Sequence, residues 1–282
     1  MNMSVKQKIK KIIQNIILVS KEQIIKPIII PTDKDKLLND KIALITGGSS
    51  GIGFEIAKAF QNSGAKVIIA GTKQNKIDDA ISKLGGVASG LVIDIKDINK
   101  LPEKVNNAAE IFAENRIDIL VNSAGVAAKH EFWEIDEEEY DMVMDTNAKG
   151  TFFMSRAVGK YMIEKKLKGH ILNISSSSAL RPAWTPYQMS KWELKGLTMG
   201  LADKLLPYGI VVNAIAPGPT ATPMLGKSIN DSIYKPDNPS GRYTMPEEIA
   251  ALAVFMVSSA GDMIVGDTFY MTGGSGTISL HR

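Results

Sequence analysis

Short runs of β-branched and aliphatic residues alternate with amphipathic segments from Asp40 to near the end of the chain. The runs are apolar at consecutive positions, which is typical of strands that helices cover on both faces. The segments between them, such as 53–64 and 246–259, repeat apolar positions at helical spacing. This alternation predicts one α/β domain built on a doubly wound parallel sheet. Seven strands are expected, within residues 41–46, 65–71, 90–94, 117–122, 169–175, 209–216 and 267–272.

Residues 1–39 precede the first predicted strand, so we expect an N-terminal extension followed by a domain at 40–282. The first part of the extension places aliphatic residues on one helical face and lysines off it, and Pro27 and Pro31 then favour an extended arm. We expect the extension to pack on the domain or on a neighbouring subunit. A membrane surface is the alternative partner, because a basic amphipathic helix can bind anionic lipid.

A second irregular segment, 218–243, is rich in Gly, Pro, Asn and Ser and separates a predicted strand from a helix. Loops of this length in compact domains are usually functional, so we expect it to close over a substrate. Five apolar residues suggest a pocket there: Met224, Leu225, Ile229, Ile233 and Trp184.

Composition restricts the possible functions. The formal net charge is only +3, which gives no electrostatic basis for nucleic-acid binding. Cysteine is absent, which excludes thiolate chemistry and agrees with a cytoplasmic location. The three histidines show no metal-ligand spacing, so no metal site is expected. No apolar run reaches the roughly 20 residues of a membrane-spanning helix, and we expect no signal peptide.

The first predicted strand leads directly into the glycine-rich sequence TGGSSGIG, residues 46–53. Gly47, Gly51 and Gly53 allow a sharp turn and a close approach of the backbone to a ligand. A helix beginning near Ile52 would direct its free N–H groups at a pyrophosphate. Because the turn lies between a strand and a helix at the start of a βαβ series, it predicts a dinucleotide site.

The spacing Gly-x-x-x-Gly-x-Gly resembles that of the short-chain dehydrogenase/reductase family, and the resemblance extends from about residue 40 to 274. Further motifs occur in the family's order: LVIDIKD at 91–97, VNSAG at 121–125, TNAKGTF at 146–152, NISS at 173–176, YQMSK at 187–191, APGPTATPM at 216–224 and TGG at 272–274. The resemblance implies a Rossmann-like fold, a nicotinamide cofactor and a homo-oligomer, in this family a homotetramer. The compact core is similar to 3-oxoacyl-thioester reductases and related carbonyl reductases.

The resemblance also assigns residues to the cofactor. These are Gly47, Ser49, Ser50, Gly51, Ile52, Gly53, Thr72, Lys73, Asp94, Ile95, Asn122, Ser123, Ala124, Gly125, Tyr187, Lys191, Pro217, Gly218, Thr220 and Thr222. It assigns catalysis to Asn147, Ser176, Tyr187 and Lys191, with Ser176 holding the substrate oxygen and Asn147 anchoring a water in a proton relay. Lys191 would also bind the nicotinamide ribose.

Two tyrosine–lysine pairs have the i, i+4 spacing that this chemistry needs: Tyr187 with Lys191, and Tyr161 with Lys165. Tyr161 is surrounded by lysines and is interpreted as part of a solvated basic helix face. Tyr187 follows a buried strand and a serine-rich strand end, where open α/β sheets bind ligands. We therefore assign catalysis to Tyr187. An ammonium at about 4 Å stabilises a phenolate by roughly 4 kcal/mol at an effective dielectric of about 20. This predicts a lowered phenol pKa, suited to a general acid or base.

The sequence departs from the family pattern twice. Ser176 precedes Tyr187 by 11 positions where the family usually has about 13, and the run Ser175–Ser178 leaves the choice of serine open, although NISS favours Ser176. Ser123 stands where the family often has a second asparagine, which leaves open how side chains join the strands there.

The second predicted strand ends at Gly71, where an NAD enzyme of this type would place a carboxylate on the ribose hydroxyls. No acidic residue follows before Asp78, and Thr72 and Lys73 could bind a 2′-phosphate. No arginine is present in residues 71–78, and Ser50 occupies a position that is basic in some NADP-using relatives. The pattern favours NADP(H) over NAD(H), while Lys73 as an ordinary surface lysine is the alternative.

Together these observations predict an NADP(H)-dependent oxidoreductase that transfers a hydride between nicotinamide and a carbonyl or secondary alcohol. The alternative is a catalytically idle NADP(H)-binding sensor or scaffold on the same fold. A sugar-nucleotide epimerase fits the glycine spacing less well. The substrate class stays open among 3-oxoacyl thioesters, sugars, polyols and steroid-like ketones, as does the direction of the reaction.

Overall fold

The computed structural model describes residues 37–227 and 231–278, which all belong to one compact unit of the chain. Seven parallel strands form a single sheet in the order β3-β2-β1-β4-β5-β6-β7. Their bounds are β1 Ile42–Thr46, β2 Lys66–Gly71, β3 Ala88–Val92, β4 Ile119–Asn122, β5 Gly169–Ile174, β6 Ile210–Pro217 and β7 Thr268–Met271. The predicted doubly wound parallel sheet is confirmed, and it has the Rossmann-like arrangement.

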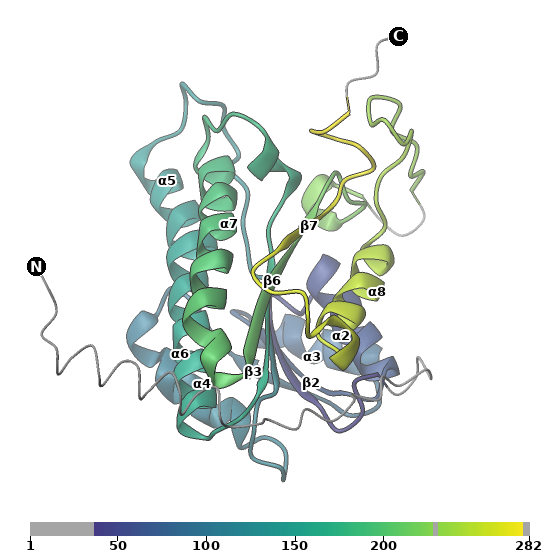
Figure 1. Ribbon diagram of the computed structural model, residues 1–282. Helices are drawn as coiled ribbons and strands as arrows, with labels where there is room; N and C mark the ends of the chain where they lie inside the picture. Colours follow the sequence, from purple (N-terminus) through teal and green to yellow (C-terminus); the bar gives the residue numbers. More distant parts are fainter. Residues whose placement is uncertain (1–36, 228–230, 279–282) are drawn as a thin grey trace, which may run out of the picture. The chain divides into compact units, whose positions relative to one another are not determined.

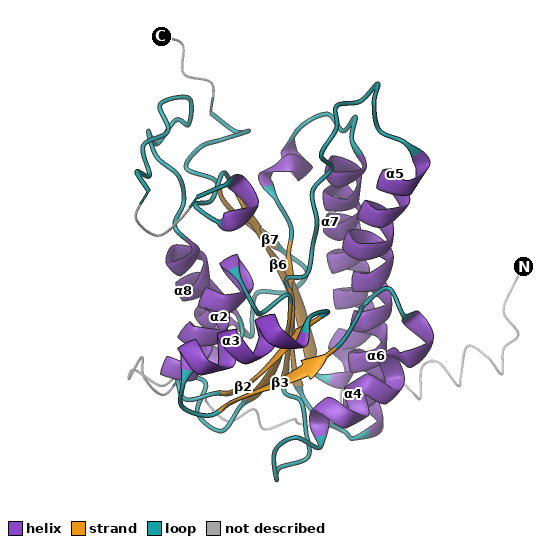
Figure 2. Ribbon diagram, turned by 180° about the vertical axis from the view of Figure 1, so that it is seen from behind, coloured by secondary structure: helices purple, strands orange, loops and turns teal. Residues whose placement is uncertain are grey.

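Helices cover both faces of this sheet (Figures 1 and 2). One face is covered by α2 Gly51–Asn62, α3 Gln74–Leu84 and α8 Pro246–Met256. The other is covered by α4 Leu101–Ala109, α5 Glu137–Met144, α6 Thr151–Glu164 and α7 Pro186–Leu205. A six-residue π-helix, Asp145–Gly150, joins α5 to α6. The sheet is therefore the middle layer of three.

Each central strand contributes side chains to two cores, one on each face of the sheet. In β1, Ala43 and Ile45 pack with α2 and α8, whereas Ile42 and Leu44 pack with α4 and α6. The period of two along a strand produces this division, and it explains why the strands are apolar at consecutive positions. The first core begins before β1, because Leu38 is fully buried in it.

The topology changes direction between β1 and β4. The chain moves outward from β1 to β2 and β3 and then returns to β4 on the other side of β1. Thr46 and Asn122 are paired at the carboxyl ends of these two strands. A crevice outside strand ends at such a switch point is the usual ligand site of open α/β sheets.

The predicted N-terminal extension falls almost wholly on residues 1–36, which lie outside the described residues. Its helix, its arm and the boundary at residue 40 therefore stay predictions. Among the residues that the structure describes, no helix is long and apolar enough to cross a membrane. In the same residues, no group of three or more acidic or histidine side chains could hold a metal ion.

Candidate active site

The glycine-rich turn joins β1 to α2 and is shaped by two residues with positive φ, Gly47 at +65° and Gly51 at +56°. A Cβ atom on Gly53 would lie 2.5 Å from the carbonyl oxygen of Gly47, so only glycine allows the helix to start this close to the strand. Ser50 is the N-cap of α2, but its side chain makes no capping hydrogen bond, and the first turn contains no acidic residue. The helix N-terminus is therefore available to an anion.

Thr46 connects the ends of β1 and β4. Its hydroxyl donates to the carbonyl of Val121 at 3.3 Å and accepts from the backbone N–H groups of Ser123 and Ala124 at 3.2 and 3.3 Å. The motif placed Thr46 at the start of the pyrophosphate-binding turn, but its role in joining the two strand ends was not predicted. A hydroxyl residue directly before the first glycine of such a turn was the available signal.

The presence of Ser123 left open which side chains link the strands at this point, and in the structure Asn122 provides the link. Its amide donates to Oδ1 of Asn173 on β5 and to the hydroxyl of Ser155 on α6, both at 2.9 Å. Asn173 in turn donates to Thr198 on α7 at 3.0 Å. Buried amide and hydroxyl side chains thus join two strands to two helices directly beneath the switch point.

Tyr187 and Lys191 lie in the first turns of α7. Thr185 caps this helix in a capping box with Gln188, and Pro186 is its first residue, so the sequence fixes where the helix begins. The Lys191 ammonium donates to the carbonyl of Ile174, at the end of β5, at 3.0 Å. The same ammonium lies 5.5 Å from the centre of the Tyr187 ring.

The titration of this pair differs from the sequence-based prediction. Burial raises the pKa of Tyr187 above its ordinary value, and a hydrogen bond with Ser176 only partly opposes this. Burial also lowers the pKa of Lys191 to about 8. The sequence-based prediction was the opposite, a lowered phenol pKa, because it included the attraction to Lys191 but not the loss of solvent around both groups.

Asn147 lies in the π-helix between α5 and α6 and is fully buried. Its side chain accepts from the N–H of Val126 and donates to the carbonyl of Val126, both at 2.8 Å, and also donates to Ser190 on α7 at 3.2 Å. These three hydrogen bonds commit the amide to protein groups. A water held by this residue would bind either its backbone or the second lone pair of Oδ1. Asn147 also lies in a π-helical segment, and such segments are frequent at functional sites.

One cavity of about 200 Å³ joins these parts. Its walls include the glycine turn, the segment after β4, Tyr187, Lys191 and Thr222. A Cβ atom on Gly125 would lie 3.3 Å from Oδ1 of Asn147 and 3.9 Å from Nζ of Lys191, which shows how closely these groups converge. The predicted residues that line this cavity are Gly47, Ser49, Ser50, Gly51, Ile52, Gly53, Ser123, Ala124, Gly125, Tyr187, Lys191 and Thr222.

A second cavity of about 430 Å³ adjoins the first and shares Ile52, Tyr187 and Thr222 with it. Among the predicted residues, Ser176, Pro217, Gly218 and Thr220 line this second cavity. Further lining residues that were not predicted individually include Arg181, Lys235, Tyr243 and Ser275. Lys235 and Tyr243 lie in the predicted substrate loop 218–243, and Arg181 lies between the serine run and Tyr187, whereas Ser275 had no sequence signal.

Other predicted residues line neither cavity. Thr72, Lys73 and Asp94 are exposed beyond the ends of β2 and β3, and Ile95 is buried against Gly150. Of the expected apolar pocket, Met224 and Leu225 do line the second cavity. Ile233 lines a different cavity, half-exposed Trp184 lines none of those described, and Ile229 lies outside the described residues.

Tyr161 is not part of a solvated helix face, as its lysine neighbours suggested. It is buried in the hydrophobic core on the side of the sheet that α4 and α6 cover, and its hydroxyl donates to the carbonyl of Asn115 at 3.1 Å. Asn115 precedes β4, whereas ligands bind at the opposite, carboxyl ends of the strands. The geometry thus separates Tyr161 from the cavities that Tyr187 lines.

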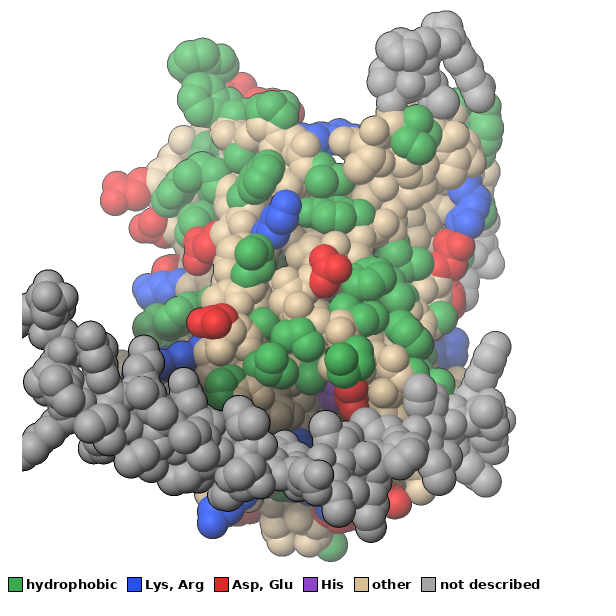
Figure 3. Space-filling view, in the orientation of Figure 1, with side chains coloured by type: hydrophobic (Ala, Val, Ile, Leu, Met, Phe, Trp, Pro, Cys, Tyr) green, Lys and Arg blue, Asp and Glu red, His purple; other side chains and the backbone are tan. Residues whose placement is uncertain are grey.

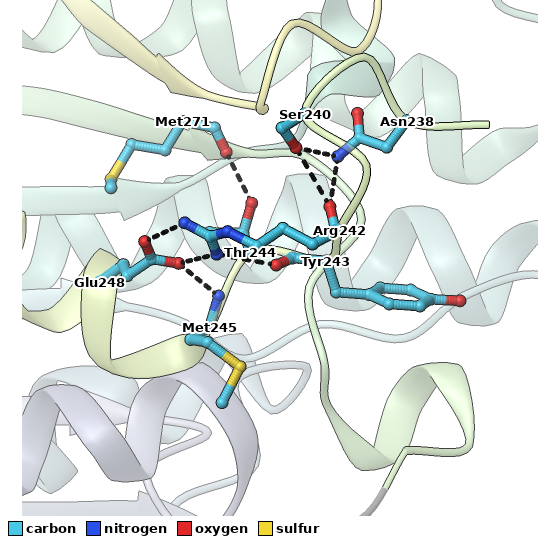
Figure 4. A network of polar contacts seen from close by, with 8 residues as sticks. All are labelled: Asn238, Ser240, Arg242, Tyr243, Thr244, Met245, Glu248 and Met271. Atoms are coloured by element: carbon cyan, nitrogen blue, oxygen red, sulfur yellow. Dashed lines mark hydrogen bonds and ion pairs between the residues drawn. The ribbon is translucent and has the colours of Figure 1, made fainter. Parts of the chain in front are cut away.

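The described part of segment 218–243 is held to the rest of the domain by backbone and side-chain contacts (Figure 4). Thr220 pairs with Thr244 and Tyr234 with Arg242 in isolated bridges. Arg242 binds Glu248 at the start of α8 through two hydrogen bonds of 2.7 and 2.8 Å, which are the main cause that lowers the pKa of Glu248 to about 2. The wall that these residues form is therefore anchored to α8.

Comparison with known proteins agrees with this geometry. The sequence profile described as short chain dehydrogenase matches residues 41–232. The chain belongs to the short-chain dehydrogenase family. It is 34% identical to a 3alpha-hydroxysteroid dehydrogenase of Mediterraneibacter gnavus, with 84% of this chain and 97% of the relative covered. It is also 34% identical to an NAD-dependent glycerol dehydrogenase of Listeria innocua, with 86% and 96% covered.

Two solved structures of this family are similar over nearly their whole length. A 3-ketoacyl-(acyl-carrier-protein) reductase of Brucella melitensis complexed with NADH has a TM-score of 0.76 at 30% identity, covering 86% of this chain and 100% of that one. An actinorhodin polyketide ketoreductase with NADPH has a TM-score of 0.76 at 26% identity, covering 88% and 100%. The chain is thus an NAD(P)-type oxidoreductase of alcohol and carbonyl groups.

Proposed function

We propose that this short-chain dehydrogenase transfers a hydride between NADP(H) and a carbonyl or secondary alcohol, with Tyr187 as the general acid and base. The observation that carries the proposal is the convergence of Tyr187, Lys191 and Ser176 at the junction of two cavities. The glycine turn lines one cavity, and the other has room for a substrate.

The residues of the first cavity fit a dinucleotide. The uncapped N-terminus of α2 and the backbone of residues 47–53 would hold the pyrophosphate. Residues 122–125, Lys191 and Thr222 would bind the nicotinamide half, while Thr220 and the Pro217–Gly218 turn would flank it. When bound, the nicotinamide supplies or accepts the hydride, and the protein supplies binding, orientation and the proton.

Within this proposal the chain's own residues handle the proton. In the reduction direction the Tyr187 hydroxyl donates its proton to the substrate oxygen, and the Ser176 hydroxyl holds that oxygen by a hydrogen bond. Burial keeps the phenol protonated, which is the form that a general acid needs. Asn147 holds Val126 and Ser190 in place, so it orients the segment after β4 and the first turns of α7.

The proposed preference for NADP(H) rests on the end of β2. Gly71 provides no carboxylate for the ribose hydroxyls, and in the described part of the chain no acidic side chain pairs with Lys73. Thr72 and Lys73 are exposed and would bind the 2′-phosphate, with Asp94 and Ile95 near the adenine. Related proteins include an NAD-dependent enzyme as well as an NADPH complex, so only measurement decides between the two cofactors.

We also propose a homo-oligomer, of which a homotetramer is the form expected from the family. Large apolar side chains are exposed on α6, α7 and α8, including Phe152, Trp192, Met199 and Phe255. Figure 3 shows hydrophobic side chains gathered on one face of the molecule. Exposed apolar patches are typical of protein interfaces. A cytoplasmic location remains our expectation from the cysteine-free sequence.

Titration with NADPH and NADH, followed by a panel of ketones, tests the function directly. We expect tight NADPH binding and loss of reduced-nicotinamide absorbance with at least one ketone. Binding without turnover on any ketone or alcohol would instead favour the idle sensor or scaffold. No binding of either nucleotide would contradict both functions.

A further inference from the structure

The second cavity carries positive charge beside Tyr187. Arg181 and Lys235 both line it, and its lining residues include no aspartate or glutamate. A cleft lined by charges of one sign concentrates the field and attracts ligands of the opposite sign. The cavity is thus suited electrostatically to an anion.

Of these two residues, Arg181 has the positive charge that is less compensated by a carboxylate. Its guanidinium donates to the hydroxyl of Ser275 at 2.6 Å, and no ion pair joins it to a carboxylate within residues 37–227 and 231–278. A guanidinium has five N–H donors in a fixed plane, so several remain for a ligand. Ser275 also lines the cavity, which places the hydrogen-bonded end of Arg181 at its wall.

Lys235 adds to this charge, although it is partly compensated. Its ammonium pairs with Asp237 at 2.7 Å and lies 5.3 Å from the centre of the Tyr243 ring, which is drawn in Figure 4. The Asp237 side chain is 73% exposed, whereas that of Lys235 is 22% exposed. An exposed ion pair of this kind is weak, so it leaves the lysine able to interact with an anion in the cavity.

Hydroxyl groups line the rest of the polar wall. Their residues are Ser175, Ser176, Ser177, Ser178, Thr220, Thr222 and Ser275. Apolar side chains, including Ile52, Met224 and Leu225, complete the wall, so the cavity offers hydrogen bonds to an oxygenated substrate and apolar contacts to its carbon skeleton.

Building on the proposed function, we infer that the substrate is a ketone or alcohol carrying an anionic group, either a carboxylate or a phosphate, that Arg181 binds at the wall it shares with Ser275. Carboxylate and phosphate share the geometry that a guanidinium binds with two parallel hydrogen bonds. The steady-state consequence is a lower KM for the charged member of any matched substrate pair.

Two matched pairs test this inference and distinguish the two anions. L-sorbose and 5-keto-D-gluconate differ by a terminal carboxylate, and dihydroxyacetone differs from its phosphate by the phosphoryl group. We expect kcat/KM to be higher for at least one charged member. Arg181→Gln should remove about 10- to 100-fold of that advantage through KM, and Arg181→Lys should remove less.

Three control variants separate charge from structure. Ser275→Ala removes the hydrogen-bond partner of Arg181 but keeps its charge, so the preference for the anion should remain. Arg156→Gln makes the same charge change on α6, away from this cavity, and should leave both substrates unaffected. The rate with the neutral substrate reports whether Arg181→Gln is folded.

Equal loss for charged and neutral substrates in Arg181→Gln, or a preference for the neutral member of both pairs, would overturn the inference and leave the oxidoreductase proposal intact. If no ketone is turned over, calorimetry with D-gluconate and glycerol phosphate still tests whether Arg181 forms an anion site. Binding that Arg181→Gln abolishes supports the anion site without the activity, whereas no binding of either anion refutes the site.

Discussion

The ammonium of Lys191 lies 5.5 Å from the centre of the Tyr187 ring, one turn further along α7, and donates to the carbonyl of Ile174. Both side chains titrate away from their ordinary values because both are removed from water. The lysine is therefore held as a buried cation with one hydrogen bond. Such a group is costly to the fold, and a cost of this kind is expected where residues serve a ligand.

Lys191→Met should stabilise the folded protein at pH 7. A lysine pKa lowered from 10.5 to about 8 corresponds to a penalty on the order of 3 kcal/mol for the charged form. The Ile174 carbonyl would lose its partner in the variant, which costs about 1–3 kcal/mol. We therefore expect a net gain of roughly 1 kcal/mol in the free energy of unfolding, measured in urea, together with loss of activity.

The effect of Lys191→Met on the free energy of unfolding should depend on pH. Between pH 8 and 10.5 the unfolded chain binds the Lys191 proton and the folded protein does not, so wild-type stability rises with pH. Below pH 8 both states are protonated and the full penalty is present. The advantage of Lys191→Met should thus be largest below pH 8 and shrink above it. Lys204→Met, which changes an exposed lysine on α7, is the control and should change the free energy of unfolding little.

Tyr187→Phe and Tyr161→Phe should have opposite effects on activity and stability. Removing the Tyr187 hydroxyl should lower kcat by about 10²–10⁴-fold while nucleotide binding persists, because only the proton donor is lost. Removing the Tyr161 hydroxyl breaks its bond to Asn115, which should cost about 0.5–1.5 kcal/mol of stability and leave kcat unchanged. An active Tyr187→Phe would contradict the assignment of the general acid.

The pH dependence of kcat/KM should differ between the reduction and the oxidation directions. Reduction needs the neutral phenol, and the raised pKa of Tyr187 keeps it neutral, so kcat/KM for reduction should be flat from pH 5 to 7, below the pKa of about 8 of Lys191. Oxidation needs the phenolate, so its kcat/KM should rise about tenfold per pH unit over this range. Ser176→Ala removes the hydrogen bond that lowers the phenol pKa and should shift the oxidation profile to higher pH. A reduction rate that falls between pH 5 and 7, where Lys191 stays protonated, would contradict the raised pKa of Tyr187.

The sequence predicted the sheet and the glycine turn because both depend on local signals. Consecutive apolar residues in β1 reflect burial on two faces, and Gly47 and Gly51 reflect positive φ angles. The burial of Tyr161 could not be predicted in this way, since its lysine neighbours describe the exposed side of the same helix. Tertiary packing alone determines which side a tyrosine occupies.

The second cavity was predicted only in part, because its residues come from four separate segments. Arg181, Lys235 and Ser275 are far apart in the chain and meet only after β5, β6 and β7 are aligned. The titration of Tyr187 was missed for a related reason. A helical spacing indicates which charge is near, but the loss of solvent depends on everything packed around the pair.

Glu248→Gln should weaken the attachment of segment 218–243 to α8 without changing any residue that lines the second cavity. Glu248 accepts from Arg242 and from the N–H of Met245, and these bonds anchor the end of segment 218–243 to α8 (Figure 4). We expect KM to rise several-fold while kcat changes less, measured by steady-state kinetics. Because the pKa of Glu248 is lowered from 4.5 to about 2, the wild-type anchor should also weaken as pH falls from 4.5 toward 2. Glu247→Gln, the neighbouring residue, is the matched control, and equal effects of the two changes would contradict the anchor.

Gly71→Asp should shift cofactor preference from NADPH toward NADH. A Cβ atom at this position would lie 3.6–3.8 Å from Ile77 and Ser49, which is ordinary van der Waals contact, so the fold should accept the side chain. The new carboxylate would end β2 where it can accept hydrogen bonds from the ribose hydroxyls and would repel a 2′-phosphate. We expect the ratio of kcat/KM for NADPH over NADH to fall at least tenfold, and Gly71→Asn, which adds similar bulk without charge, to change it less. Lys73→Ala should lower the same ratio by weakening NADPH alone. If neither Gly71→Asp nor Lys73→Ala changes the ratio, the end of β2 does not select the cofactor.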